Sequence, residues 1–399
     1  MNRRAFLKSG AIAMFGAGAA PAWLARAASS SEGRARKVLV ALFQRGAADG
    51  LAMVPPHAEE TYYKLRPSIA APKGEVIDLD GRFGLHPSLA PLKKLWDAKQ
   101  LAIVQAVGSP DPTRSHFDAQ DYMESGTPGV KSTRDGWLNR SLRGEAKSPV
   151  RAVGMGQILP RALRGAQPAV AVASLPNFRL RDERTATAFE QMYAADRGMA
   201  AAAKETFEAV RLLRSVPNTP PAAGVSYPGG RLGQSLQQIA QLIKADAGLE
   251  VAFADMGGWD THANQAPQLS NLLSQFGGAL AAFAEDLGER MQNVAVVTMS
   301  EFGRTAKENG SRGTDHGHAN VMFLFGGGVP GGRVYGRWPG LAPEQLYEGR
   351  DLAVTTDFRD VLSELASRQL GVEPSVVFPG YQARSAVSDK RSAIVTADR

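Results

Sequence analysis

The sequence contains no cysteine, so disulfide bonds cannot hold the fold together. Stability must come from a large apolar core or from a bound metal ion, and 44% of the residues are hydrophobic. The chain also lacks a run of about 20 apolar residues, the length that a transmembrane helix needs. Beyond the N-terminal segment it has no basic run interleaved with aromatic residues, which argues against a nucleic-acid surface.

The N-terminal segment is distinctive. Residues 1–27 contain the pair Arg3-Arg4, a short Gly- and Ala-rich apolar stretch, and an Ala-x-Ala motif that ends at Ala27. This order is typical of a twin-arginine (Tat) signal peptide cleaved after Ala27. We therefore expect the folded chain to use the Tat translocase and to work in the periplasm or as a secreted protein. The alternative is an ordinary helix or a membrane anchor that follows two arginines by chance.

The signal also accounts for much of the basic character of the chain. It carries four basic residues and no acidic one, so its removal lowers the formal net charge from +7 to +3. The high isoelectric point therefore indicates targeting rather than a basic binding surface.

Short apolar runs alternate with helical patterns along the rest of the chain. Branched and aromatic residues predict β-strands over 38–43, 101–107, 169–173, 249–254, 294–299 and 321–325. Apolar spacing predicts helices over 88–99, 116–125, 232–247 and 269–291. This alternation is typical of parallel strands joined by crossover helices. We predict an α/β fold, a three-layer α/β/α sandwich with a mostly parallel central sheet.

Residues 199–231 interrupt the alternation. An Ala- and charge-rich helix is predicted over 200–215, and a Pro- and Gly-rich stretch follows it to Gly230. We interpret this segment as an excursion between the two halves of the sheet. Residues 28–399 are expected to form one domain, since large α/β sheets often reach this length.

Polar residues gather just after four of the predicted strands. The loops concerned begin at Gln44, Gly108, Asp255 and Ser300. Ligands of open α/β sheets bind beyond the carboxyl ends of the strands, so these loops are expected to share one site.

The residue types in this region suit a divalent cation, because carboxylates supply oxygen and imidazoles supply nitrogen. Two tight clusters, over 260–262 and 315–318, hold three of the six histidines. Each cluster alone also fits a helix cap or a solvated turn, but together with strand-end carboxylates they predict a metal site. The candidate ligands are Asp49, Asp260, His262, Glu301, His316 and His318.

Ser115 is the candidate nucleophile. It precedes the helix predicted over 116–125, where backbone N–H groups and the helix dipole favour an anion. A hydroxyl near a metal can ionise and attack phosphorus or sulfur, although an ordinary N-capping serine occupies the same position. Arg114 and Arg304 are candidate partners of phosphate or sulfate oxygens, with ordinary ion pairs as the alternative.

The combination of these motifs resembles a known family. The motifs are the signal peptide and residues 38–50, 113–118, 257–262, 300–305 and 315–318. They are similar to the exported family known as domain of unknown function 1501, which looks like a branch of the alkaline phosphatase and sulfatase superfamily. The resemblance spans nearly the whole mature chain and implies an alkaline phosphatase-like fold.

The resemblance also implies roles for individual residues. Members of that superfamily hold two metal ions, usually zinc or manganese, beside a nucleophile at a helix start; calcium is an alternative metal. Asp49 matches the aspartate after the first strand, and Ser115 matches the nucleophile. The ligands of the second half match Asp260, His262 and one of the pair His316 and His318.

One position departs from the superfamily pattern. Glu301-Phe302 stands where an Asp-His pair is usual, so one imidazole is missing unless His116 or His316 replaces it. The Asp-x-His spacing at Asp260 is also tighter than usual. An altered two-metal site, a single metal and a fold without catalysis are the three alternatives.

The leading hypothesis is an exported metal-dependent hydrolase of phosphate or sulfate esters, with a small anionic ester or glycan as substrate. The alternative is a non-catalytic periplasmic binding protein with a degenerate site. A third hypothesis is a carbohydrate-modifying enzyme that uses Asp49 and Glu301 as paired carboxylates. Replacement of Asp260 or His262 separates the first two, because only an enzyme would lose turnover.

Overall fold

The structure is a computed structural model that describes residues 36–176 and 200–386. The chain divides into two units, Met1–Arg36 and Lys37–Arg399, and the second is described below. The predicted signal peptide lies outside the described residues. Among the helices of the described ranges, none combines the length and the apolar character needed to cross a membrane.

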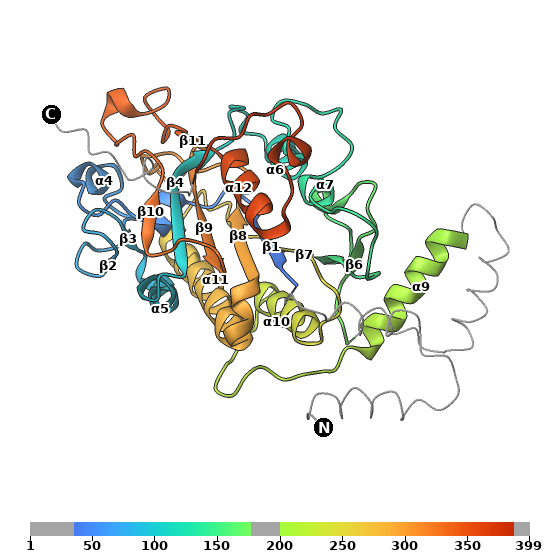
Figure 1. The fold of residues 1–399 in the computed structure, drawn as a ribbon. Helices are drawn as coiled ribbons and strands as arrows, with labels where there is room; N and C mark the ends of the chain where they lie inside the picture. Colours follow the sequence, from blue (N-terminus) through green and yellow to red (C-terminus); the bar gives the residue numbers. More distant parts are fainter. Residues whose placement is uncertain (1–35, 177–199, 387–399) are drawn as a thin grey trace, which may run out of the picture. The chain divides into compact units, whose positions relative to one another are not determined.

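A large central sheet runs through the unit (Figure 1). Its strand order is β10-β4-β9-β8-β1-β7-β5-β6, and β11 pairs with β4 beside this path. The strands are β1 (Val38–Gln44), β4 (Leu101–Gly108), β5 (Ala152–Met155), β6 (Val170–Val172), β7 (Val251–Met256), β8 (Val294–Met299), β9 (Asn320–Gly326), β10 (Arg333–Tyr335) and β11 (Thr356–Asp357). Only β9 runs antiparallel to its neighbours, β4 and β8. The predicted mostly parallel sheet is confirmed.

Every residue of β1, β4 and β8 is buried, because helices cover both faces of the sheet. One face carries α5 (Lys93–Asp97), α10 (Arg231–Lys244) and α11 (Gln265–Leu287), with the 3-10 turn η1 (Pro87–Leu92). The other face carries α6 (His116–Ser125), α7 (Trp137–Arg140), α12 (Phe358–Leu370) and α13 (Pro374–Val377). The three-layer α/β/α arrangement is therefore confirmed (Figure 1).

The apolar core on the α12 side of the sheet contains every second side chain of β1. Leu39, Ala41 and Phe43 of β1 pack in one apolar cluster with Phe358 and Phe378. Successive side chains of a strand point to opposite faces, so the intervening residues of β1 face the α10 and α11 layer.

The remaining elements are short or peripheral. They are α3 (Gly50–Met53), α4 (Glu60–Leu65), β2 (Ile77–Asp78), β3 (Gly84–Leu85), η2 (Arg161–Leu163), α9 (Ala200–Ser215), η3 (Gly288–Asn293) and η4 (Pro343–Gln345). The helix α9 occupies the residues predicted for it within the excursion.

The predicted helices match the structure to different degrees. The helix predicted over 116–125 coincides with α6, which ends at Gly126 in the left-handed conformation (φ 72°). The helix predicted over 88–99 is divided into η1 and α5, and Pro91 lies within the 3-10 turn. Proline cannot donate the backbone hydrogen bond of an α-helix interior, which explains the division.

The reversed direction of β9 decides where the functional loops meet. Parallel strands bring their carboxyl ends to one edge, so the loops after β1, β4, β7 and β8 lie together. Because β9 is antiparallel to β4 and β8, the loop that precedes it lies at that same edge. This loop contains His316.

Candidate metal centre

Three potential metal donors converge at the carboxyl edge of the sheet. His116 opens α6, Asp260 lies in the loop after β7, and His316 lies in the loop before β9. One ligand atom from each lies within 4.8 Å of the other two, which makes them a candidate metal-binding group. Within residues 36–176 and 200–386, this is the one group of three or more such side chains with that geometry.

The spacing of these donors fits a metal of zinc size. His116 Nε2 lies 3.0 Å from His316 Nε2. The Asp260 carboxylate lies 3.3 Å from His316 Nε2 and 3.5 Å from His116 Nε2. Ligand atoms about 2.0–2.1 Å from a tetrahedral ion are about 3.3 Å apart from one another. The residues present therefore fit a divalent ion with nitrogen and oxygen ligands.

His262 adjoins this trio. Its Nε2 lies 3.0 Å from His316 Nε2 and 2.9 Å from Asp260 Oδ1. Its Nδ1 faces the carboxylate of Asp315 at 3.3 Å. The structure thus brings Asp260, His262 and His316 together, and it adds His116 to them.

The Nδ1 atoms of two imidazoles are fixed by acceptors. His116 Nδ1 lies 2.8 Å from Glu301 Oε1, and His316 Nδ1 lies 3.0 Å from the backbone carbonyl of Arg114. A carboxylate and a carbonyl only accept hydrogen bonds, so both Nδ1 atoms carry the proton. Each neutral ring then directs the lone pair of its Nε2 atom at the centre. This is the arrangement that a metal-binding histidine adopts.

Glu301 is buried and fully engaged. Its Oε1 accepts hydrogen bonds from His116, from Gln120 Nε2 at 2.9 Å and from the backbone N–H of Gly46 at 2.8 Å. The hydroxyl of Ser300 donates to its Oε2 at 3.0 Å. Burial alone would raise the pKa of Glu301, but these donors outweigh it and lower the pKa. Glu301 therefore orients His116 as an anion.

The same contacts separate the pKa values of the two imidazoles. The hydrogen bond to Glu301 raises the pKa of His116 above its ordinary value. Burial, followed by the positive charge of His116, lowers the pKa of His316. Burial also opposes ionisation of Asp260, but the Arg304 guanidinium outweighs it and lowers the Asp260 pKa. In the metal-free protein, a protonated His116 can donate from Nε2 to a neutral His316.

Arg304 ties the loops of the site to one another. Its guanidinium is fully buried and donates to the carbonyls of Ala47, Gly46, Trp259 and Thr314 and to the Asp260 carboxylate. All of its nitrogen atoms are used in this way, so none is directed at a bound anion. Arg304 positions Asp260 from behind.

Two glycines permit the close approach of these loops. Gly46 has φ +114°, and a Cβ atom on it would lie 2.7 Å from the backbone nitrogen of Asp260. A Cβ atom on Gly317 would lie 2.3 Å from the backbone of Arg304. Real Cβ atoms do not approach other atoms so closely, so both positions need glycine.

Phe302 supplies the apolar side of the centre. It follows Glu301, at the position where the resemblance expects an imidazole. Its ring centroid lies 5.0 Å from that of His116 and 5.1 Å from that of His316. His116, which comes from the start of α6, brings a further imidazole to the cluster.

The structure does not bring Asp49 into this cluster. Its two carboxylate oxygens accept hydrogen bonds from Arg66 Nη1 at 2.7 and 2.9 Å, and Gln265 Nε2 donates at 2.6 Å. Its side chain also caps α3 through the N–H of Ala52. Asp49 and Glu301 are both buried with internal partners, which disfavours a paired-carboxylate site.

The remaining predicted site residues surround the cluster. Ser115 is exposed at the start of α6 and makes no side-chain cap to the helix. The guanidinium of Arg114 pairs with Asp351 at 2.6 Å and with Glu348 at 2.8 Å. His318 is buried and turned toward the carbonyl of Ser109, 3.1 Å from its Nε2.

Sequence reasoning did not assign His116 and Gln120 to the site. His116 was named only as a replacement for the missing imidazole, because nothing in its neighbourhood distinguishes it from a residue of the first helical turn. The one signal that points to it is Phe302, which stands where the resemblance expects an imidazole, so that another histidine is needed to supply it. Gln120 is one helical turn from His116, on the same face of α6.

Comparison with known proteins agrees with the motifs. The family described as "Protein of unknown function (DUF1501)" matches residues 36–378. No curated protein matches the sequence.

Several solved structures are similar to this chain at low identity. The C-terminal periplasmic domain of EcEptC from Escherichia coli, in complex with zinc, is 8% identical with a TM-score of 0.36; the match covers 75% of each chain. The PsFucS1 sulfatase from Pseudoalteromonas is 14% identical with a TM-score of 0.39, over 88% of this chain and 72% of that one. The alkaline phosphatase of the Antarctic bacterium TAB5 is 9% identical with a TM-score of 0.30, over 73% and 92%.

The motifs at the strand ends and the extent of the family match lead to one conclusion: the chain belongs to the DUF1501 family.

Proposed function

We propose that this protein is an exported, metal-dependent hydrolase of phosphate or sulfate esters. The observation that carries the proposal is the convergence of His116, Asp260 and His316, with the Nδ1 atoms of both imidazoles held by acceptors. Structural ion pairs and surface clusters do not need several imidazole lone pairs directed at one point. A site that binds a divalent ion does.

The residues of the chain hold and shape the site. His116, His316 and Asp260 bind the ion, and His262 is close enough to complete its coordination. Zinc or manganese fits these donors, and such an ion polarises an ester oxygen and lowers the pKa of a nearby hydroxyl. Glu301 and Arg304 keep His116 and Asp260 in place.

Ser115 is the proposed nucleophile. It lies in the chain between Arg114, whose carbonyl contacts His316, and His116 itself. The Ser115 side chain accepts no hydrogen bond from the first N–H groups of α6, which an α-helix leaves without partners in the helix itself. These N–H groups and the helix dipole favour an anionic oxygen of the substrate.

The test is hydrolysis of p-nitrophenyl phosphate and p-nitrophenyl sulfate by the mature protein with added zinc or manganese. We expect turnover that Ser115→Ala reduces at least about a hundredfold without loss of metal. Ser274→Ala, an exposed serine of α11, is the matched control and should keep full turnover. Unchanged turnover in His316→Ala would contradict the proposal.

A non-catalytic binding protein is the second candidate, and one observation favours it. Both arginines expected to hold a leaving anion are committed to internal partners: Arg304 to carbonyls and Asp260, and Arg114 to Asp351 and Glu348. A metal-loaded protein that binds phosphate or sulfate but turns over neither ester would support this candidate.

Export through the Tat route is part of the proposed function and is supported by the sequence of residues 1–27. The test is the distribution of the full-length chain between cytoplasm and periplasm in a bacterium with a Tat system. Replacement of Arg3-Arg4 by two lysines should leave the uncleaved chain in the cytoplasm. Unchanged export of this variant would exclude the Tat route.

A further inference from the structure

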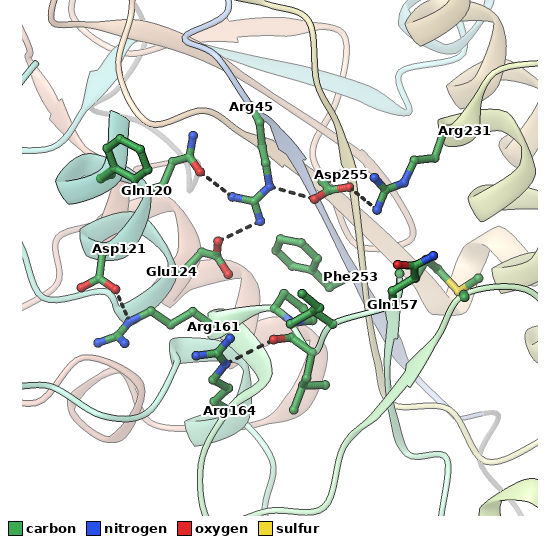
Figure 2. Close-up of a pocket in the computed structure, with 17 residues that line it drawn as sticks. Arg45, Gln120, Asp121, Glu124, Gln157, Arg161, Arg164, Arg231, Phe253 and Asp255 are labelled. Atoms are coloured by element: carbon green, nitrogen blue, oxygen red, sulfur yellow. Dashed lines mark hydrogen bonds and ion pairs between the residues drawn. The ribbon is translucent and has the colours of Figure 1, made fainter. Parts of the chain in front are cut away.

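A large pocket opens beside α6, the helix that begins with His116 (Figure 2). It has a volume of about 850 Å³ and lies at the carboxyl ends of β1, β5, β6 and β7. Its walls come from α6, from the segment 155–164 after β5, and from the start of α10. The volume is in the range of pockets that hold small organic ligands.

The pocket carries a surplus of positive charge. Arg45 lies between the carboxylates of Asp255 and Glu124, at 2.8 and 2.9 Å, and Arg231 shares Asp255 at 3.1 Å (Figure 2). Arg161 pairs with Asp121 at 2.7 Å.

Arg164 is the pocket arginine whose guanidinium is not paired with a carboxylate of the pocket. It is exposed and donates from Nε to the carbonyl of Leu159 at 3.2 Å. Among the described residues, no carboxylate forms an ion pair with it. Arg231 is also exposed and has only a share of one carboxylate. Both guanidinium groups are therefore available to an anion in the pocket.

The rim of the pocket is apolar and exposed. The Phe117 side chain is 90% exposed and that of Ile158 is 77% exposed. Exposed single apolar residues are ordinary, but these are two of the three large hydrophobic side chains that are exposed in the described part of the chain. Their position at one pocket indicates a surface that a ligand covers.

The pocket is joined directly to the metal centre. Phe117 follows His116 in α6, so the exposed ring begins one residue from a proposed metal ligand. Gln120 lines the pocket, accepts a hydrogen bond from Arg45 Nη1 at 2.9 Å and donates to Glu301 at 2.9 Å. Gln120 thus contacts both a pocket arginine and the carboxylate that orients His116.

We propose that this pocket binds an acidic saccharide, with Phe117 against the apolar face of a sugar ring and Arg164 and Arg231 on its anionic substituent. The assignment of this sugar as the alcohol part of the ester rests on the proposed function; the binding itself does not. Aromatic rings and planar guanidinium groups suit such a ligand, because the first offers a flat apolar surface and the second binds carboxylate, sulfate or phosphate in a bidentate manner.

The composition of the pocket favours a sugar over a lipid. Nine of its 17 lining residues carry polar or charged side chains, among them Gln120, Gln157 and the three acidic residues. These donors and acceptors match the hydroxyl groups of a saccharide. An alkyl chain would take the exposed guanidinium groups of Arg164 and Arg231 out of water without giving them an anionic partner, which costs free energy.

The test is isothermal titration of the mature protein with three probes: a heparin-derived tetrasaccharide, the neutral cellotetraose and dodecyl phosphate. We expect the acidic tetrasaccharide to bind at least about tenfold more tightly than either of the others, a difference of about 1.4 kcal/mol. Tighter binding of dodecyl phosphate, or no binding of the tetrasaccharide, would overturn the proposal.

Surface variants distinguish binding of the tetrasaccharide in the pocket from general electrostatic attraction to the protein. The double variant Arg164→Ala, Arg231→Ala should weaken tetrasaccharide binding about tenfold or more, and Phe117→Ala about fivefold. Arg290→Ala, an exposed arginine of η3 at the opposite edge of the sheet, should bind as the wild type does. Equal weakening by Arg290→Ala, or no effect of the pocket variants, would overturn the proposal.

The two proposals fail in distinguishable ways. His316→Ala removes a metal ligand but no pocket residue, so it should abolish ester turnover and keep tetrasaccharide affinity within about twofold. If the protein has no esterase activity yet binds the tetrasaccharide through Phe117 and Arg164, the hydrolase proposal fails alone. If turnover depends on His316 but no tetrasaccharide binds, the pocket proposal fails alone.

Discussion

The Glu301 carboxylate accepts a hydrogen bond from His116 Nδ1 at 2.8 Å, and this contact sets the direction of the opposite nitrogen of the ring. Glu301 comes from the end of β8 and His116 from the start of α6, so the contact joins two halves of the candidate site. A carboxylate behind a metal-binding imidazole fixes its tautomer and makes it a stronger donor.

Replacement of Glu301 by glutamine should therefore weaken metal binding without removing a metal ligand. We expect zinc affinity to fall about tenfold to a hundredfold, as is usual for loss of such a partner. Competition with a chromophoric chelator measures it. Glu285→Gln, an exposed residue of α11, is the matched control, and an equal loss of affinity in that variant would contradict the role of Glu301.

The same contact predicts a pH dependence in the metal-free protein. The hydrogen bond to Glu301 raises the pKa of His116, so the folded state holds this proton above the ordinary value of 6.5. The stabilisation from the pair is fully present below pH 6.5 and is lost as the pH rises through the raised pKa. Burial lowers the pKa of His316, so that ring should titrate below 6.5.

NMR titration of the imidazole protons of the chelator-treated protein measures both values. In Glu301→Gln the pKa of His116 should move down toward 6.5. A wild-type His116 that titrates below His316 would show that the carboxylate does not hold a charged ring.

Arg304 should matter more for the stability of the folded chain than for the binding of metal by the ligands themselves. Arg304→Ala leaves four backbone carbonyls and Asp260 without their donor, and unsatisfied buried groups are costly. We expect the free energy of unfolding to fall by about 3 kcal/mol or more. Urea denaturation followed by tryptophan fluorescence measures it.

Arg304→Lys is the informative companion to the alanine variant. It keeps the charge but cannot reproduce the planar set of donors, so it should recover only a small part of the lost stability. Full recovery by lysine would mean that the charge alone holds the loops.

Asp49 offers a direct contrast between a structural carboxylate and a metal ligand. Asp49→Asn removes the charge that pairs with the fully buried Arg66, which should cost about 3–5 kcal/mol of unfolding free energy. The folded fraction should bind metal as the wild type does. Asp97→Asn, at an exposed ion pair with Lys93, is the control and should change stability little.

Metal analysis of the folded Asp49→Asn protein decides between the two roles. If it is stable but lacks metal, Asp49 is a ligand, as the family resemblance implied. If the variant is less stable but still contains metal, the role of Asp49 is structural: it holds the loop after β1 in place.

The sequence predicts the sheet well where strands are long and buried. The runs that became β1, β4, β7, β8 and β9 are mostly apolar and almost fully buried, because helices cover both of their faces. The strands β5, β10 and β11 are four residues or shorter and carry too little pattern. The antiparallel direction of β9 depends on pairing with distant strands, which periodicity does not encode.

Some residues of the candidate site were likewise predictable from the sequence, and others were not. Strand-end loops predicted Asp260, His262 and His316, since a shared edge brings such loops together. The contact between Glu301 and His116 depends on where α6 starts relative to β8, and the pocket depends on segment 155–164 beside α6. Both are tertiary relationships between parts of the chain that are far apart in sequence.

The most direct test of this account is the metal content of the mature protein by elemental analysis, after purification without chelators. The wild type and His57→Ala should hold about one zinc or manganese ion per chain, because His57 pairs with Asp78 away from the centre. The double variant His116→Ala, His316→Ala should hold none. Absence of metal from the wild type even after reconstitution, or full occupancy of the double variant, would contradict the account.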